Sequence, residues 1–166
     1  RRSFGTGAEV YDRVRPRYAT EAIVWAVGDR PCRVLDLGAG TGILTRQLAE
    51  LGYQVSAVEP DEQMLGRLRA AVDRQLGSTA AEHVRSRLGS AEEIPLSDAS
   101  VDVVIAGQSY HWFDPGPAHD EIARVLVPGG VFAPIWNLRD DSVGWVADLT
   151  RILASADTTR SDGVGY

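Results

Sequence analysis

The stretch VLDLGAGTGILTRQLAE, residues 34–50, most constrains the fold of this chain, because an apolar run passes directly into three glycines within five positions. The run before the glycines has the composition of a buried strand, and the apolar residues after them have helical spacing. Glycines at such a junction let the backbone turn sharply and approach a ligand closely. The stretch therefore predicts a strand, a bare turn and a helix, with a binding site at the turn.

Strands and helices alternate along the rest of the chain. Strands are predicted at CRVLDL (32–37), YQVSAVE (53–59), residues 84–88, VDVVIA (101–106) and, after a turn at PGG (128–130), VFAPIW (131–136). Helices are predicted from Thr20, as N-cap, to Gly28, from residue 43 to Gly52, from Pro60 and Asp61 onward, over 117–127 and over 142–155. The continuously apolar strands predict an α/β fold class, a doubly wound, Rossmann-like, mostly parallel sheet with helices on both faces.

Length and charge narrow the possible functions. At 166 residues, 44% of them hydrophobic, the chain is long enough for one domain around one core. The net charge of -6 opposes the phosphate backbone, so no nucleic-acid partner is predicted. All 17 basic residues are arginine, which removes Schiff-base chemistry and a P-loop lysine from consideration.

Cysteine content and hydropathy bear on metal binding and location. Cys32 is the only cysteine, which excludes an intrachain disulfide and a thiolate cluster, and no metal is predicted. No apolar run reaches the length of about 20 residues that spans a bilayer, and the first ten residues lack the apolar core of a signal peptide. A cytoplasmic protein without a membrane partner is therefore predicted.

The glycine spacing distinguishes between kinds of nucleotide site. Gly38, Gly40 and Gly42 follow the pattern G-x-G-x-G, whereas a dinucleotide site prefers G-x-G-x-x-G and would need a glycine in place of Ile43. The spacing disfavours a pyrophosphate cradle without excluding it. An ordinary strand-to-helix turn stays open as the alternative.

Two acidic residues at strand ends favour an adenosine-type ligand. Glu59 ends the second strand about 20 residues after the loop, the separation at which a carboxylate accepts hydrogen bonds from ribose hydroxyls. Asp36 lies near the end of a buried strand. A buried carboxylate lowers stability there unless it binds loop amides or a cationic ligand group.

The chain resembles the class I S-adenosylmethionine-dependent methyltransferases, and within them the small-molecule group called methyltransferase type 11. The matching pieces are VLDLGAGTG, SAVEPDEQML, GSAEEIPLSDASVDVVIAGQSYHWF and RVLVPGGVFAPIW, in the family's order. The resemblance implies an enzyme that moves a methyl group from S-adenosylmethionine to a small-molecule acceptor by in-line displacement, with S-adenosylhomocysteine as the product.

The resemblance also implies positions for the cofactor. Asp36, Gly38, Ala39, Gly40, Thr41 and Gly42 would surround its methionyl part, Glu59 would bind the ribose, Pro60 and Met64 would flank the adenine, Ser90 and Ala91 would meet the adenine edge, and Gln108 would lie under the sulfonium. Many relatives have aspartate where this chain has Ser90. Either Ser90 or Glu92 is then expected to accept from the adenine amine.

The segment QSYHWFD after the fourth strand is the expected acceptor side. His111 is the candidate base, because its ordinary pKa is near neutral, and a hydrogen-bonded packing role is the alternative. Tyr110, Trp112 and Phe113 could form an apolar wall. Positioning alone could suffice, since a base is needed only for an acceptor that carries a proton. His83 and His119 are expected on element surfaces.

The ends of the chain carry further expectations. Residues 1–19 would form a lid with Tyr11, Arg15 and Tyr18 toward cofactor or substrate, or else a solvated flap. Residues 20–140 would form the cofactor-binding core of a single domain 1–166, and residues 141–166 a helix and tail. The family's C-terminal edge strands are missing after Trp136, so the chain is expected to be either a fragment or a shortened protein whose sheet edge a partner chain covers. A monomer or a homodimer is expected.

Two other functions stay open. One is a non-catalytic S-adenosylmethionine-binding module that acts as a regulator or subunit. The other, less favoured, is a NAD-dependent oxidoreductase, against which Ile43 and the lack of a recognisable catalytic tyrosine-lysine or histidine-aspartate set argue. Fold analogy alone does not decide among these.

Overall fold

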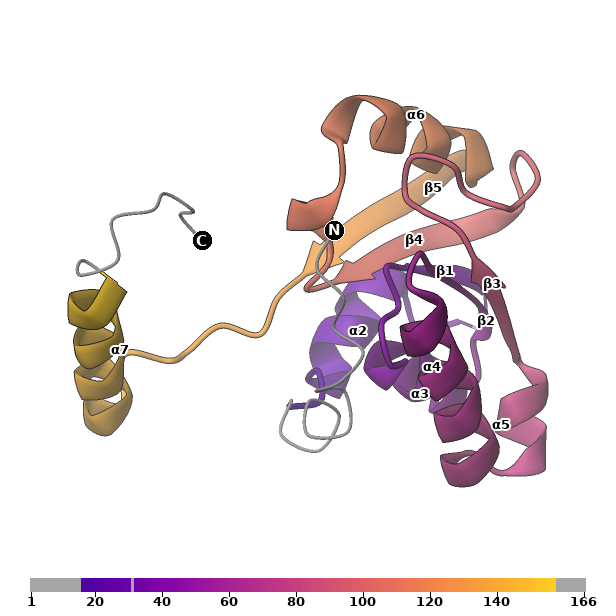
Figure 1. The fold of residues 1–166 in the computed structure, drawn as a ribbon. Helices are drawn as coiled ribbons and strands as arrows, with labels where there is room; N and C mark the ends of the chain where they lie inside the picture. Colours follow the sequence, from indigo (N-terminus) through magenta and orange to yellow (C-terminus); the bar gives the residue numbers. More distant parts are fainter. Residues whose placement is uncertain (1–15, 31, 158–166) are drawn as a thin grey trace. The chain divides into compact units, whose positions relative to one another are not determined.

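The computed structural model describes residues 16–30 and 32–157 of the chain. The chain divides into two compact units, Arg1–Trp136 and Asn137–Tyr166. The described part of the first unit contains a five-stranded sheet, and that of the second contains one helix, α7 (Gly144–Asp157) (Figure 1). The residues expected to form the site and described here all belong to the first unit.

The sheet is parallel throughout, with the strand order β3-β2-β1-β4-β5. Its strands are β1 (Arg33–Leu37), β2 (Gln54–Glu59), β3 (Val84–Leu88), β4 (Val101–Gly107) and β5 (Leu126–Ile135). The order reverses direction between β1 and β4, and open α/β sheets bind ligands at the carboxyl ends of strands beside such a point. The predicted α/β fold class is confirmed.

Helices cover the sheet on both faces (Figure 1). The sheet therefore separates the hydrophobic core into two clusters. The described part of the first unit has the helices α2 (Thr20–Val27), α3 (Ile43–Glu50), α4 (Glu62–Gln75), α5 (Ser78–Glu82), the 3-10 turn η1 (Tyr110–Trp112) and α6 (Pro115–Val125). Val34 packs with α2, α3 and α4, whereas its neighbour Leu35 packs with α6. Successive residues of a strand face opposite sides of the sheet, and helices cover both sides. This explains why β1 is apolar at both Val34 and Leu35.

Several predicted boundaries were wrong. Thr20 is the first helical residue, and the N-cap is Ala19, which has extended backbone angles and makes no side-chain cap. The helix predicted over 117–127 begins at Pro115, since proline suits the first turn. The predicted turn at 128–130 lies inside β5, where the pairing with β4 shifts in register and Gly129 has a φ of +80°.

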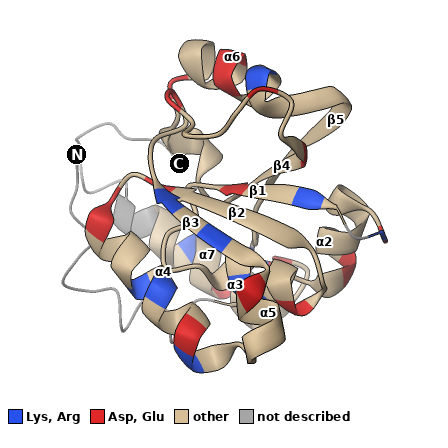
Figure 2. Cartoon of the chain, turned by 90° about the vertical axis from the view of Figure 1, so that its right-hand side faces the viewer, with Lys and Arg blue, Asp and Glu red and all other residues tan. Residues whose placement is uncertain are grey.

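The edge strand β3 presents charge to solvent. Arg85 and Arg87 are exposed on it, and Figure 2 shows basic residues on both β3 and α4. Arg69 of α4 donates from Nε to the Ser86 hydroxyl at 2.9 Å and so joins the helix to the strand. Charged side chains on an edge strand discourage pairing with another sheet.

The two histidines expected on surfaces differ in their exposure. His119 is exposed on α6, as expected, whereas His83 is partly buried after α5, and its Nδ1 has no hydrogen-bond partner among the described residues. No helix in the described part of the chain is long and apolar enough to cross a membrane.

Candidate functional site

The glycine loop between β1 and α3 has a left-handed backbone at each glycine. The φ angles of Gly38, Gly40 and Gly42 are +73°, +57° and +80°. A Cβ on Gly38 would lie 2.6 Å from the Ser109 Cβ, and one on Gly42 would lie 2.6 Å from the Leu68 Cγ. A Cβ on Gly40 would meet nothing within 4 Å. The outer two glycines are therefore required by packing, and the middle one faces open space.

Glu59 ties this loop to the end of β2. Its carboxylate accepts from the Gly40 N–H at 2.8 Å and from the Asp61 N–H at 3.0 Å. Burial raises the pKa of Glu59, and these two amides oppose that rise. Glu59 is thus a structural part of the loop, a role that the sequence reasoning missed.

Asp36 is almost fully buried, 1% exposed, at the end of β1. The Thr45 hydroxyl donates to its Oδ2 at 2.5 Å, and the Thr45 N–H in the first turn of α3 also donates to it. Burial raises the pKa of Asp36 to about 7; the bonds from Thr45 oppose the rise and the charge of Glu59 adds to it. The partner of Asp36 is therefore a helix residue rather than the loop amides that the sequence suggested.

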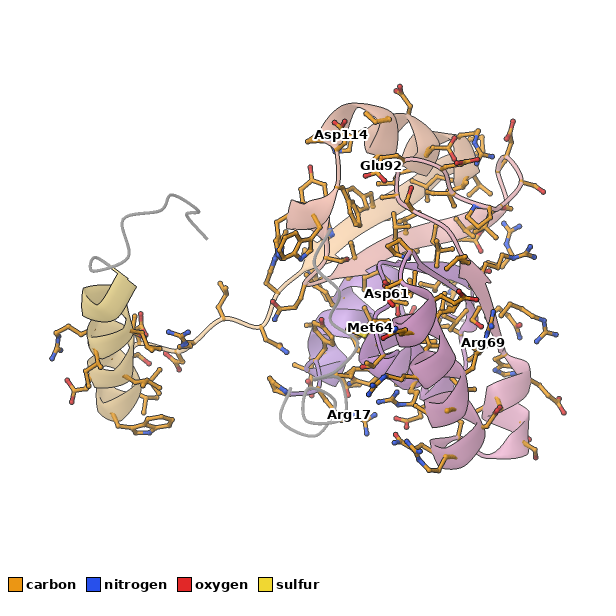
Figure 3. The ribbon with its side chains drawn as sticks, viewed as in Figure 1. Arg17, Asp61, Met64, Arg69, Glu92 and Asp114 are labelled. Carbon is orange, nitrogen blue, oxygen red and sulfur yellow. The ribbon has the colours of Figure 1, made fainter. Side chains whose placement is uncertain are left out.

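The first turn of α4 follows directly after Glu59. The Asp61 carboxylate caps the helix by accepting from the N–H groups of Gln63 at 2.8 Å and Met64 at 3.2 Å. Met64, labelled with Asp61 in Figure 3, is buried, whereas Pro60 is exposed. Pro60 and Met64, expected at the adenine, thus lie one residue and five residues after the loop-binding Glu59.

The segment Ser90–Glu92 follows β3, whose end is joined to β2 by the Gly89 N–H and the Glu59 carbonyl at 3.2 Å. Ala91 is buried. The Glu92 carboxylate accepts from the Asp114 N–H at 2.9 Å. Burial acts to raise the pKa of Glu92, but hydrogen bonding to the Asp114 amide and to Ser90 outweighs it and lowers that pKa. Glu92 is therefore held in its charged form.

At the end of β4 the chain is left-handed at Gln108, with a φ of +58°. The Gln108 N–H donates to the Ile135 carbonyl at 2.9 Å, and the Ser109 hydroxyl donates to the Leu37 carbonyl at 2.7 Å. Such conformations of residues other than glycine cluster at functional sites. Ser109, which the sequence reasoning did not single out, joins the ends of β1 and β4.

Tyr110 is the centre of an aromatic cluster. Its hydroxyl and the His119 Nε2 are 2.9 Å apart, and its ring makes edge contacts with Phe113, Phe132 and Trp136 at centroid distances of 5.8, 5.5 and 6.3 Å. His119 was expected only on a surface, and nothing in the local sequence indicates this pairing.

His111 and Trp112, also expected at the acceptor, lie at the surface beside this cluster. Their ring centroids are 4.9 Å apart, and Trp112 is 59% exposed. A large exposed aromatic side chain next to a binding site is suited to contact a ligand. Their roles stay predictions.

Tyr18 is bonded through its backbone to α3, and its expected role toward cofactor or substrate stays a prediction. Its N–H donates to the Gln47 Oε1 at 3.0 Å, and its carbonyl accepts from the Gln47 Nε2 at 2.8 Å. A Cβ added at Gly107 would be 2.7 Å from the Tyr18 hydroxyl, so this ring reaches the end of β4. Tyr11 and Arg15 lie outside the described residues.

A family profile described as a methyltransferase domain matches residues 35–133. These residues include the glycine loop, Glu59, Glu92 and Tyr110. The chain belongs to the methyltransferase domain family. The family predicted from the motifs is thereby confirmed, and the α/β sheet is the fold of its solved relatives.

Three similarities place this methyltransferase domain among known proteins. An uncharacterized methyltransferase of Mycobacterium bovis is 48% identical over 91% of this chain and 58% of its own length. One of Schizosaccharomyces pombe is 38% identical over 92% of this chain and 59% of its own length. The crystal structure of an S-adenosylmethionine-dependent methyltransferase from Mesorhizobium loti is 27% identical, covers 68% of this chain and 49% of that one, and has a TM-score of 0.55. The chain spans less than two thirds of the length of these curated relatives.

Proposed function

We propose that this domain binds S-adenosylmethionine and transfers its methyl group to a small-molecule acceptor. The observation that carries the proposal is the open space at Gly40, whose N–H the buried Glu59 carboxylate binds, in the loop that follows β1 beside the switch point of the sheet. The similarity to a Mesorhizobium loti enzyme that depends on S-adenosylmethionine supports the same cofactor.

The chemistry of the loop suits this cofactor. When bound, S-adenosylmethionine supplies a methyl group on a positively charged sulfur, together with an ammonium group. Burial raises the pKa of both Asp36 and Glu59, and a cationic ligand beside them favours their charged forms. The Glu59 oxygens each accept one amide, and a carboxylate oxygen can accept a second donor such as a ribose hydroxyl.

The remaining cofactor residues follow from the same proposal. The loop residues Gly38, Ala39, Thr41 and Gly42 would enclose the methionyl part, and Gln108 would line the cleft below the sulfonium. Pro60 and Met64 would flank the adenine, and Ser90, Ala91 and Glu92 would meet its edge. Buried Ala91 and Met64 offer apolar surface for a ring, and Glu92 offers a charged acceptor.

The acceptor would lie beside the aromatic cluster. Tyr110 and Trp112 would orient it and exclude water, so that its nucleophile lines up with the methyl group. Exposed His111 is the candidate for removing a proton from an acceptor that carries one. Tyr18, which precedes α2 and whose hydroxyl reaches the end of β4, would contact the cofactor or the acceptor.

Calorimetric titration with S-adenosylmethionine, S-adenosylhomocysteine and NAD tests the proposal. The two adenosyl ligands are expected to bind and NAD is not, and Glu59→Ala is expected to lose binding because the amides of Gly40 and Asp61 lose their acceptor. Glu62→Ala, which removes the same charge from an exposed position at the start of α4, is the control and should bind as the parent does. Absence of binding by the parent protein would refute the proposal.

A further inference from the structure

Glu92 connects two segments that are distant in sequence. The segment 90–92 is proposed to meet the adenine, and the segment 110–114 carries the acceptor-side residues. The Glu92 Oε1 accepts from the Asp114 N–H at 2.9 Å, directly after the turn that contains His111 and Trp112 (Figure 3). One carboxylate therefore lies at the junction of the two proposed binding regions.

The chain that follows Glu92 is anchored separately on α6. The Ile94 N–H donates to the Glu121 Oε2 at 2.7 Å, and Arg124 donates from Nη2 to the Ile94 carbonyl at 2.9 Å and from Nη1 to the Leu96 carbonyl at 2.8 Å. These contacts fix the 94–96 stretch to the body of the helix. The Glu92 contact is distinct from them, because it reaches the residue that joins η1 to α6.

Ser90, two residues before Glu92, helps to lower the pKa of the Glu92 carboxyl. The negative charge available at this edge therefore belongs to Glu92. A ligand amine that donates to Glu92 would then share the carboxylate with the Asp114 N–H. A change in the orientation of Glu92 would alter its hydrogen bond to the Asp114 N–H and so the position of residues 110–114.

We propose that Glu92 is a positioning residue that couples occupation of the adenine site to the arrangement of the acceptor segment 110–114. The inference rests on the proposed function, since it takes an adenosyl ligand at residues 90–92. Thermodynamic reciprocity requires that a change on the acceptor side also alter the affinity for that ligand.

The Asp114 amide can be removed without touching the cofactor residues. Asp114 has a φ of -78°, which proline adopts, and Phe113 before it has the extended angles that a following proline requires. Asp114→Pro removes the N–H that Glu92 accepts, whereas Asp114→Ala removes the same side chain and keeps the N–H. The pair isolates one hydrogen bond.

Calorimetric titration with S-adenosylhomocysteine gives the first readout. Asp114→Pro is expected to raise the Kd about fivefold or more relative to Asp114→Ala, because Glu92 loses the donor that orients it. Equal Kd values in the two variants would overturn the coupling. If the parent protein binds no S-adenosylhomocysteine, the proposed function fails and the inference fails with it.

Fluorine NMR of protein labelled with 5-fluorotryptophan gives a readout that a purely structural role would not move. Saturating S-adenosylhomocysteine is expected to shift the Trp112 resonance in the parent and in Asp114→Ala but not in Asp114→Pro, with exposed Trp25 on α2 as the internal control. A Trp112 resonance that stays unmoved in a parent protein known by calorimetry to be saturated would overturn the coupling while leaving the proposed function intact.

Should Asp114→Pro fail to fold, Glu92→Ala and Glu93→Ala replace the pair, because they remove the same charge from neighbouring positions. Only Glu92 accepts from the Asp114 amide. The Trp112 shift at saturating ligand is expected to disappear in Glu92→Ala and to remain in Glu93→Ala. A full shift in Glu92→Ala would refute the inference.

Discussion

The cofactor side and the acceptor side of the proposed site are built in opposite ways. Around the glycine loop, buried carboxylates accept from backbone amides and a threonine, and the glycines leave no room for side chains at two of three positions. Around Tyr110, aromatic rings pack on one another and Trp112 remains largely exposed. The first region is therefore fixed by the backbone, whereas the second is shaped by side chains.

The largest expected effect comes from crowding the backbone-determined region. Gly38→Val is expected to lower the free energy of unfolding by about 3 kcal/mol or more, because a left-handed φ and a contact with Ser109 are both unfavourable. Gly40→Val also requires a side chain at a left-handed φ but makes no close contact, so it should lower the free energy of unfolding by less. Chemical denaturation of both variants measures the difference, and equal losses would contradict the distinction drawn between the two glycines.

Removing the partner of Asp36 should have the next largest effect. Thr45→Val is expected to cost about 2 kcal/mol, since a buried carboxylate loses a hydroxyl donor while the side-chain volume is nearly unchanged. Thr20→Val, at an exposed helix start, is the control and should change the unfolding free energy by less than about 0.5 kcal/mol. A Thr45→Val protein as stable as the parent would show that the hydroxyl contributes nothing.

The pH dependence of stability should report Asp36. Its folded pKa of about 7 lies above the ordinary value of an unfolded aspartate, so its contribution is fully present below about pH 4 and is lost as pH rises to about 7. Asp36→Asn is expected to reduce that loss by about 1 kcal/mol or more, measured by denaturation at pH 4.5 and pH 8. The raised pKa of Glu59 gives a pH dependence of the same sign. Glu59 remains in the variant, so part of the pH dependence of stability should persist. An unchanged profile would exclude Asp36 as its source.

The smallest effect is expected on the acceptor side. Tyr110→Phe removes the hydroxyl next to the His119 Nε2 and keeps the ring contacts, so a loss of about 1 kcal/mol or less is expected. The affinity for S-adenosylhomocysteine, measured by calorimetry, should fall less than in Asp114→Pro, because the hydrogen bond from the Asp114 N–H to Glu92 remains. A loss of affinity as large as that of Glu59→Ala would mean that the Tyr110 hydroxyl belongs to the cofactor side.

Local sequence signals predicted the elements that form the cofactor side. The strand at 84–88 was predicted with the bounds Val84–Leu88 that the structure has, and the strands around Asp36 and Glu59 were predicted to within one residue at either end. Apolar runs, glycines and a capping aspartate act over a few residues, so they can be recognised without the fold. The errors at Thr20 and at residues 128–130 arose where backbone geometry, rather than residue type, decided the boundary.

Short patterns of residue types were enough to predict the α/β class, the bare loop and the two carboxylates beside it. The partners of the polar side chains depend on the fold: Thr45 for Asp36, Asp114 for Glu92, His119 for Tyr110 and Leu37 for Ser109. Ser109 and Leu37 are 72 residues apart, and they meet because β1 and β4 are adjacent in the sheet. Contacts of that kind follow from strand order and helix packing, which no local pattern encodes.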